Sequence, residues 1–428
     1  MREQPDGMDV FSRGTGREDK PLLASEIGED KQVPLSPLQG SKKAENAEIR
    51  KIAIMLPRLS RYGGVEQFGY RLAEGLARRG HEVDFICARQ EAEAPPGVKV
   101  IAVGRPWGMK FLKLARFVWK AERLRKEGVY DLSISLGKSW NQDITRMGGG
   151  PLRIFWAKSE LAVPPGMPRL MKKLKRRLSP ANWLTLLVEK HQFTTESEVV
   201  AVSHLVRDWL LAAHKELEPE KVHVVYNRPD TERFAPPSSS ERLQMRESLF
   251  ASCSDKGKPV PEAVFIGTAS TNFELKGVAP LIQAVARLPD NVLLFVAGGR
   301  DRGSYLRLAR KLGIGHRVFF CGKVTDMPAF YKALDIFILP TFYDACSNAV
   351  LEALASGCKT ITSSSNGAAF FLRQNAVLSD PGDVAAMARC LEDWMRQPAP
   401  TPFVWPQNVD SGLDCFMDRV EAMLERCS

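Results

Sequence analysis

The sequence lacks several features that would assign it to a simple class of protein. No apolar run is long enough to span a bilayer, and the first residues do not show the basic-then-apolar pattern of a secretory signal peptide. The eight cysteines are scattered, without a Cys-x-x-Cys pair or a Cys/His cluster. We therefore expect a reducing compartment, and neither a disulfide framework nor a structural zinc site.

Acidic residues are fewer than basic ones. The 428 residues include 60 Lys and Arg against 50 Asp and Glu, which gives a formal net charge of +10. A basic surface favours an anionic partner, such as nucleic acid, a phosphorylated glycolipid or an anionic membrane face. No recognition signature for nucleic acid accompanies the charge, so we expect no nucleic-acid partner. A chain of this length predicts two domains.

The pattern along the chain changes near residue 48. Residues 1–47 mix charges with Gly, Pro and Ser and show no sustained periodicity, which predicts a disordered extension. Afterwards, short apolar runs alternate with segments of helical spacing, which is typical of α/β domains built on parallel sheets. We expect one domain over 48–235 and a second over 236–407. The Ser-, Pro- and charge-rich residues 236–260 predict a linker with a short helix.

The most informative stretch runs from residue 335 to residue 372. DIFILP predicts a buried strand, a polar loop follows, and Ser347 or Asn348 can cap a helix that ends at Gly357. KTITSS predicts the next strand. Asp344 in the loop and Glu352 in the helix stand with seven residues between them.

This stretch suggests a nucleotide-sugar site. Free backbone N–H groups at the start of a helix favour an anion such as a diphosphate. The carboxylates of Asp344 and Glu352 can accept hydrogen bonds from sugar hydroxyls. Taken singly, Asp344 could be a turn residue and Glu352 a solvated helix residue.

The same stretch resembles the C-terminal signature of the family 4 retaining glycosyltransferases, in which two glutamates are separated by seven residues. YDACSNAVLEALASG, followed by SNGAA, is most similar to the subgroup that transfers glucose to the heptose of the lipopolysaccharide core. The resemblance covers most of the chain after about residue 50. It implies the GT-B fold, in which two doubly wound, Rossmann-like α/β domains face a cleft. The first domain would bind the acceptor and the second the donor, with a helix in 408–428 packing back on the first domain.

The resemblance implies a set of donor contacts. Lys276 precedes Gly277 at the place of the family's phosphate lysine, Asp344 would hold the donor sugar, and Glu352 would bind the ribose. These three residues form the expected catalytic set. The expected donor-binding residues are Gly267, Lys276, Arg300, Cys346, Ser347, Asn348 and Glu352, with Arg302, Arg317 and Lys323 as weaker candidates.

Three positions depart from the family pattern. The arginine that usually accompanies the phosphate lysine is missing, Glu274 stands where relatives often carry a base, and Phe370 replaces an acid. Asp344 is also one methylene shorter than the usual glutamate, so its reach can change the donor preference.

Acceptor contacts are expected from the first domain. Gly63 and Gly64 let the backbone approach a ligand, or merely turn the chain. Lys138 follows a predicted strand, at the end where α/β domains place their sites, and Asp143 follows soon after. A surface-loop role for Lys138 and Asp143 stays equally open.

Two basic amphipathic segments, residues 105–128 and 167–190, carry aromatic and aliphatic residues among many Lys and Arg. Such segments are typical of membrane-surface elements, although a solvated helix face is the simpler alternative. The resemblance implies a cytoplasmic enzyme that docks peripherally on the inner face of the bacterial inner membrane.

Together these features predict a retaining transfer of a hexose, most simply glucose, from a UDP-sugar to a heptose of the lipopolysaccharide inner core. No Asp pair with metal-ligand spacing is present, so we expect metal independence and no cofactor. No residue suggests a double-displacement nucleophile, so a front-face mechanism is expected. The alternatives are another nucleotide sugar on a different envelope glycan, or a non-catalytic protein that binds membranes.

Overall fold

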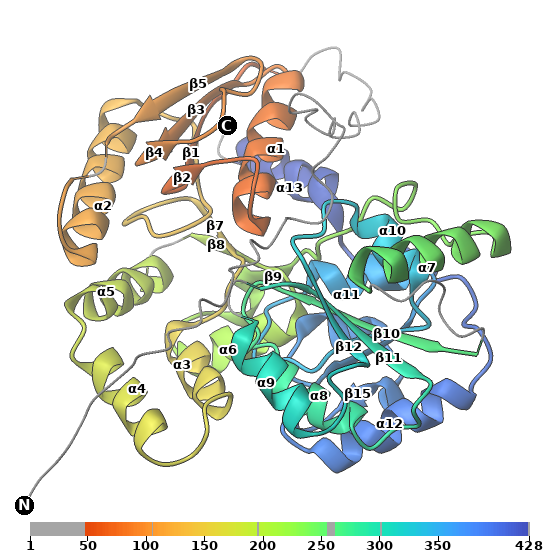
Figure 1. Cartoon of the computed structure of the whole chain (residues 1–428). Coiled ribbons are helices and arrows are strands. Elements are labelled where there is room, and N and C mark those ends of the chain that lie inside the picture. Colours follow the sequence, from red (N-terminus) through yellow and green to blue (C-terminus); the bar gives the residue numbers. More distant parts are fainter. Residues whose placement is uncertain (1–47, 105, 195–196, 255–261, 300–301, 427–428) are drawn as a thin grey trace, which may run out of the picture. The chain divides into compact units, whose positions relative to one another are not determined.

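The computed structural model describes residues 48–104, 106–194, 197–254, 262–299 and 302–426. The predicted extension over residues 1–47 lies outside these residues. Within them, two large parallel sheets and a small one form the framework (Figure 1). The predicted α/β class with two Rossmann-like sheets is therefore confirmed.

The first sheet is built from residues before position 225, and all its strand pairs are parallel. Across the sheet the order is β5 (Val98–Ala102), β3 (Glu82–Cys87), β1 (Lys51–Met55), β6 (Leu132–Ser135), β7 (Ile144–Met147), β8 (Glu198–Ala201) and β9 (Val222–Val224). The short strands β2 (Arg58–Leu59) and β4 (Arg89–Gln90) pair with each other.

The second sheet uses residues after position 263 and is also parallel. Its order is β12 (Val318–Gly322), β11 (Val292–Gly298), β10 (Val264–Ser270), β13 (Ile336–Leu339), β14 (Lys359–Ser363) and β15 (Val377–Leu378). The order of strands reverses on either side of β10, as in other doubly wound sheets.

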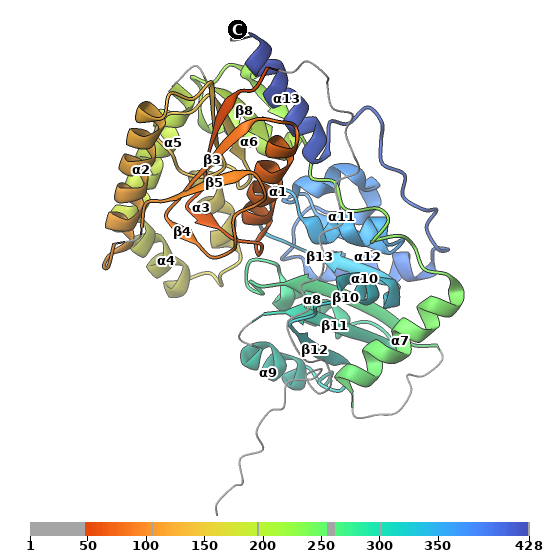
Figure 2. The ribbon, with the colours of Figure 1, turned by 90° about the horizontal axis from the view of Figure 1, so that it is seen from above.

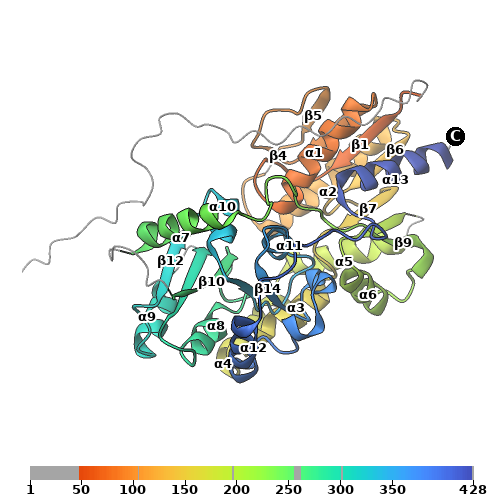
Figure 3. The same cartoon turned by 90° about the vertical axis from the view of Figure 1, so that its right-hand side faces the viewer.

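Helices connect the strands and cover the sheets. Those between or beside the strands of the first sheet are α1 (Gly64–Arg78), α2 (Lys110–Glu127), α3 (Leu152–Leu161), α4 (Met167–Arg177), α5 (Pro180–Thr194), α6 (His204–Ala213) and η1 (Pro219–Lys221). Those of the second sheet are α7 (Ser239–Cys253), α8 (Val278–Val285), α9 (Gly303–Lys311), α10 (Met327–Ala333), α11 (Asn348–Ala355), η2 (Gly367–Phe371), η3 (Gln374–Ala376) and α12 (Val384–Arg396). Helix α12 lies beside α8 (Figure 3).

The last helix, α13 (Gly412–Arg426), lies against α1 and so belongs with the first sheet (Figure 2). Its apolar side chains Phe416 and Val420 are fully buried in the core that includes the β1 residues Ile52 and Ile54. Arg79 at the end of α1 adds ion pairs to Asp418 and Glu421, both at 2.7 Å. The chain thus returns to the first sheet after completing the second.

Burial explains why these segments form strands. All four residues of β13 (IFIL) are buried, as are the inner residues of β1 and β10, because helices cover both faces of a parallel sheet. The helices begin where side chains satisfy free N–H groups. Ser203, for example, accepts a hydrogen bond from Val206 N, as is typical of an N-cap serine.

Two segments differ from the sequence prediction. Residues 236–260 were expected to hold a short helix, but α7 has 15 residues. Ser238 and Glu241 form a capping box, and Arg246 binds Asp335 of the second sheet at 2.7 Å, so long-range contacts extend the helix. The basic segment 167–190 forms two helices, α4 and α5, which are separated before Pro180 because proline starts a helix more readily than it continues one.

Candidate functional site

The predicted donor residues lie where the strands of the second sheet end. In a parallel sheet all carboxyl ends meet at one edge, where doubly wound folds bind ligands. Lys276 follows β10, Asp344 follows β13, and Asn366 follows β14. An isolated β-bridge joins Asp344 to Asn366, so the loops are tied to one another.

Lys276 and Asp344 contact each other directly. The Lys276 ammonium group forms a short ion pair with the Asp344 carboxylate and also donates to the carbonyl of Tyr343 at 3.3 Å. Gly277 fixes this position because its φ of 69° is left-handed, and a Cβ there would lie 2.1 Å from the carbonyl oxygen of Pro340. The lysine is therefore held by the backbone that follows it.

The loop into α11 holds the residues predicted to bind the diphosphate. Ser347 occupies the N-cap position but its side chain makes no capping bond, and its N–H donates to Asn366 Oδ1 at 3.1 Å. The N–H of Ser347, one of the expected donor-binding residues, is therefore already satisfied by Asn366. The Asn366 amide also binds Thr362 Oγ1 at 2.9 Å, which braces the loop against β14.

Glu352 is not the solvated helix residue that a single position would suggest. Its carboxylate accepts a hydrogen bond from the Tyr331 hydroxyl at 3.0 Å. Burial raises the pKa of Glu352, while the Tyr331 hydrogen bond and the charge of Arg233 act in the opposite direction. The carboxyl is thus fixed on the inner side of α11.

Residues of the first sheet approach the same helix. A Cβ built on Gly64 would lie 3.9 Å from Asn348 Nδ2, so the predicted glycine loop reaches the first residue of α11. Gly63 has a φ of 98°, which only glycine adopts easily. Asn227, after β9, donates to Asn348 Oδ1 at 2.7 Å. Arg146 in β7 donates in turn to Asn227 Oδ1 at 2.7 Å.

The two remaining acceptor candidates fall at opposite edges of the first sheet. Lys138 follows β6 at the carboxyl edge, and burial lowers the pKa of its amine, although Glu189 favours the charged form. Asp143 instead precedes β7, at the amino edge, where its carboxylate accepts from the N–H and hydroxyl of Ser133, each at 2.6 Å. The prediction that Asp143 contacts the acceptor is therefore wrong: this carboxylate supports the sheet.

Gly267 and Arg300 were also expected to bind the donor. Gly267 lies inside β10, because that strand continues to Ser270, and a Cβ there would lie 2.2 Å from Leu334 Cδ1. Its role is to let Leu334 pack on the strand, so the structure does not bring it to the donor site. Arg300 lies outside the described residues, and Arg302 occupies the N-cap position just before α9.

The departure at Glu274 has a structural explanation. Its carboxylate forms an ion pair with Lys172 of α4, with 2.6 Å between Oε1 and Nζ. A base at position 274 would place like charges together, whereas glutamate joins the loop before Lys276 to the basic helix.

Sequence reasoning missed Arg146, Asn227 and Tyr343 as members of the site. Tyr343 stacks on Trp209 with 4.8 Å between ring centroids, and its hydroxyl donates to the carbonyl of Gly149. Its partners come from residues far away in the chain, so local spacing carries no signal for them.

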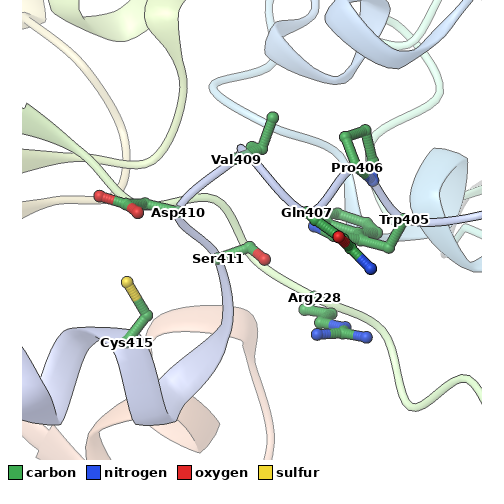
Figure 4. Close-up of a pocket in the computed structure, with 8 residues that line it drawn as sticks. All are labelled: Arg228, Trp405, Pro406, Gln407, Val409, Asp410, Ser411 and Cys415. Carbon is green, nitrogen blue, oxygen red and sulfur yellow. The ribbon is translucent and has the colours of Figure 1, made fainter.

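A separate pocket of about 220 Å³ lies between Arg228, which follows β9, and the segment that leads into α13 (Figure 4). Arg228 lies over the ring of Trp405 there, with 5.9 Å from the guanidinium carbon to the ring centroid. None of the predicted site residues lines this pocket. Among the described residues, no group of three or more His, Cys, Asp or Glu side chains could hold a metal ion.

Two family models match the chain. The model described as "Glycosyl transferase 4-like domain" matches residues 63–228, and the one described as "Glycosyl transferases group 1" matches residues 260–397. These ranges contain the glycine loop and Arg146 in the first case, and Lys276, Asp344 and Glu352 in the second.

Two curated relatives show how similar the chain is to individual glycosyltransferases. The lipopolysaccharide core biosynthesis glycosyltransferase LpsE of Rhizobium meliloti is 36% identical over 121 residues, which are 28% of this chain and 36% of that relative. The match thus spans about a third of LpsE. The lipopolysaccharide glucosyltransferase WaaG of Escherichia coli is 21% identical over 364 residues, 83% of this chain and 92% of WaaG.

Solved structures show the same fold. The crystal structure of WaaG has a TM-score of 0.67 at 20% identity, over 81% of this chain and 90% of that one. The structure of HepE from Anabaena in complex with UDP and glucose has a TM-score of 0.61 at 17% identity, over 88% of this chain and 99% of that one. Both family matches and the two parallel sheets place the chain among the group 1, family 4-like glycosyltransferases, which are enzymes of the GT-B fold.

Proposed function

We propose that this glycosyltransferase moves a hexose, glucose in the simplest case, from a UDP-sugar to a heptose of the lipopolysaccharide inner core. The observation that carries the proposal is the gathering of Lys276, Asp344 and the start of α11 at one sheet edge, with Gly64 approaching Asn348 from the other sheet. The names of the relatives LpsE and WaaG and the UDP bound to HepE support the substrate classes.

On the donor, Lys276 would neutralise the diphosphate as a compact cation, together with the N–H groups at the start of α11. Glu352 would accept hydrogen bonds from the ribose hydroxyls. Asp344 would hold the hydroxyls of the transferred sugar, and to do so it must share or release Lys276.

In the reaction, the bond between the anomeric carbon and the diphosphate oxygen breaks. The acceptor hydroxyl oxygen forms the new bond on the same face of the sugar, and its proton passes to the leaving phosphate. Negative charge grows on the diphosphate during this step, so fixed positive groups that face it lower the barrier. Because Lys276 supplies such a charge, we propose that transfer needs no metal ion and no other cofactor.

The acceptor would reach the site from the membrane surface. Helix α4 exposes an apolar row, with Leu170, Met171 and Leu174 exposed to 58%, 57% and 49%, beside Lys173 and Lys175. Such a face suits the interface of an anionic bilayer. We propose that α4 docks there, and that Trp107 and Met109 before α2 add a second contact. No helix of the described residues is long and apolar enough to cross a membrane.

The proposal is tested by offering the purified protein a panel of UDP- and ADP-sugars with heptose-terminated lipopolysaccharide, in the presence of EDTA. Turnover of one UDP-hexose despite the chelator supports the proposal and names the donor. Turnover only on another glycan, or only of a different nucleotide sugar, replaces the proposed substrate by the alternative one. Turnover that the chelator abolishes contradicts metal independence.

A further inference from the structure

Arg146, in strand β7 of the first sheet, is an almost fully buried arginine. Only 5% of its surface is exposed. Its guanidinium carbon lies over the ring of Phe68, 3.6 Å from the ring centroid, and one nitrogen donates to Asn227 Oδ1 at 2.7 Å. Both contacts hold the group in place, but neither neutralises its charge.

No carboxylate of the described residues lies within ion-pair distance of Arg146. Burial is the main influence on this group and lowers its pKa to about 10. A buried charge without a counter-ion is costly, and native proteins usually pair such a group. By contrast Arg246, whose side chain is 15% exposed, is paired with Asp335 at 2.7 Å. An anionic ligand that binds beside Arg146 would therefore neutralise its charge.

The guanidinium is directed toward the start of α11. Asn227, which accepts from Arg146, donates to Asn348 Oδ1, and Asn348 is the first residue of that helix. Burial and then the charge of Asp344 raise the pKa of the Cys346 thiol, in the loop just before the helix, and the charge of Arg146 acts in the opposite direction. Arg146 thus faces the same helix terminus that Lys276 and the loop amides surround.

Glycines follow β7 beside Arg146. A Cβ on Gly148 would lie 3.2 Å from Val65 Cγ2 and 3.5 Å from Arg146 Nη1, and one on Gly149 would meet nothing within 4 Å. A side chain at position 148 would therefore crowd Val65 and the guanidinium, whereas the backbone at Gly149 is open.

We propose that Arg146 binds the diphosphate of the donor from the side of the first sheet, opposite Lys276. The inference rests on the proposed function, since it takes a nucleoside diphosphate as the ligand. It also accounts for two departures from the family pattern. The arginine that usually accompanies the phosphate lysine is missing. Position 274 holds a glutamate, which pairs with Lys172 and, as an anion, would not bind a phosphate. A planar guanidinium can bind two phosphate oxygens at once, so the leaving group would be held from both sheets.

The test is calorimetry of UDP and of uridine with the full chain and its variants. Arg146→Met keeps the apolar contact with Phe68 and removes the charge, and Arg146→Lys keeps a charge without the fork. We expect Arg146→Met to weaken UDP binding about 10- to 100-fold and Arg146→Lys to weaken it less, whereas uridine, which has no phosphate, binds all forms equally. The exposed Arg153, in α3, provides the control Arg153→Met, which should bind UDP as the unchanged protein does.

Thermal unfolding separates binding from folding. Because Arg146 is an unpaired buried charge, Arg146→Met should melt at the same temperature or higher without nucleotide, and the rise on adding UDP should shrink. Equal UDP affinity of Arg146→Met and the unchanged protein overturns the inference. So does an equal loss for uridine and UDP, or a loss that appears only in the KM of the acceptor. If the unchanged protein binds no nucleoside diphosphate, the proposed function itself fails, which is a different result.

Discussion

The ammonium group of Lys276 lies against the carboxylate of Asp344, so the residue expected on the donor's diphosphate meets the residue expected on its sugar. Both side chains are mostly buried, with 18% and 17% exposed. Phosphate oxygens and Asp344 would therefore compete for the same lysine. When the donor binds, part of this ion pair must be exchanged for contacts to the substrate.

This competition predicts opposite effects for the two partners. Asp344→Asn removes the competing charge, so UDP should bind at least as tightly as before, while transfer should fall about 100-fold because the sugar loses a charged partner. Lys276→Met should weaken UDP binding about 10- to 100-fold and lower transfer as well. Calorimetry and a transfer assay on the same samples measure both. Lys311→Met, an exposed change in α9, is the control. Equal loss of UDP binding in Asp344→Asn and Lys276→Met would contradict the competition.

Gly277 offers a test of how the backbone positions Lys276. Gly277→Ala places a Cβ 2.1 Å from the Pro340 carbonyl oxygen, whereas Gly313→Ala, at a similar φ of 77°, meets nothing within 4 Å. Gly313→Ala should therefore cost only the left-handed strain, about 1 kcal/mol of unfolding free energy. Gly277→Ala should cost at least about 2 kcal/mol and also weaken UDP binding. Urea unfolding and UDP titration measure the two effects. Equal stability of the two variants would show that the close approach to Pro340 is not a constraint.

The pKa of Glu352 predicts a pH dependence of stability. Burial raises this pKa in the folded protein, so the folded state holds the proton more tightly than the unfolded state. The corresponding stabilisation is present below the ordinary pKa of glutamate, about 4.3, and is lost as pH rises through the folded-state value. Glu352→Gln should thus gain in melting temperature relative to the unchanged protein as pH rises from about 5 to about 8. The exposed Glu425 gives the control Glu425→Gln, which should show no such trend. A difference that shrinks with rising pH would refute the assignment.

The apolar row of α4 predicts membrane binding. Replacing Leu170 and Leu174 together by Ser should lower the affinity for vesicles that contain anionic lipid about 10-fold, because two exposed leucines no longer enter the interface. Leu243→Ser on α7, where the leucine is 60% exposed, is the matched control. Vesicle co-sedimentation at low and high salt measures both the apolar and the electrostatic part. Unchanged binding of the double variant would assign α4 to a solvated helix face.

The parallel fold could be predicted because its signals are local. The runs IFIL and KIAIM are buried along their whole length, apart from the first residue of the second, and the helices between strands carry regular apolar spacing. The helix α7 could not be predicted as readily. Its length depends on Arg242 and Arg246 reaching Asp335, about ninety positions later in the chain.

The residues of the candidate site also divide into those that local sequence indicates and those that only the packed structure reveals. Lys276, Asp344 and Glu352 could be proposed because each lies in a short local motif that resembles the family signature: Lys276-Gly277 in one loop, and the loop and helix with Asp344 and Glu352 in another. Asp143 and Gly267 were misplaced because a residue's edge of the sheet depends on where its strand begins and ends, and composition does not mark strand ends precisely. Arg146 escaped notice for another reason: its burial and its lack of a carboxylate partner are properties of the packed structure alone.

The most direct test of the central claim is the mass of heptose-terminated lipopolysaccharide after incubation with the protein, UDP-glucose and EDTA. We expect an increase by the mass of one hexose, retention of the anomeric configuration in the product, and loss of the increase in the Lys276→Met variant. An unchanged lipopolysaccharide, with donor and protein shown to be intact and UDP shown to bind, would contradict the proposed acceptor or donor sugar and leave only the glycosyltransferase family.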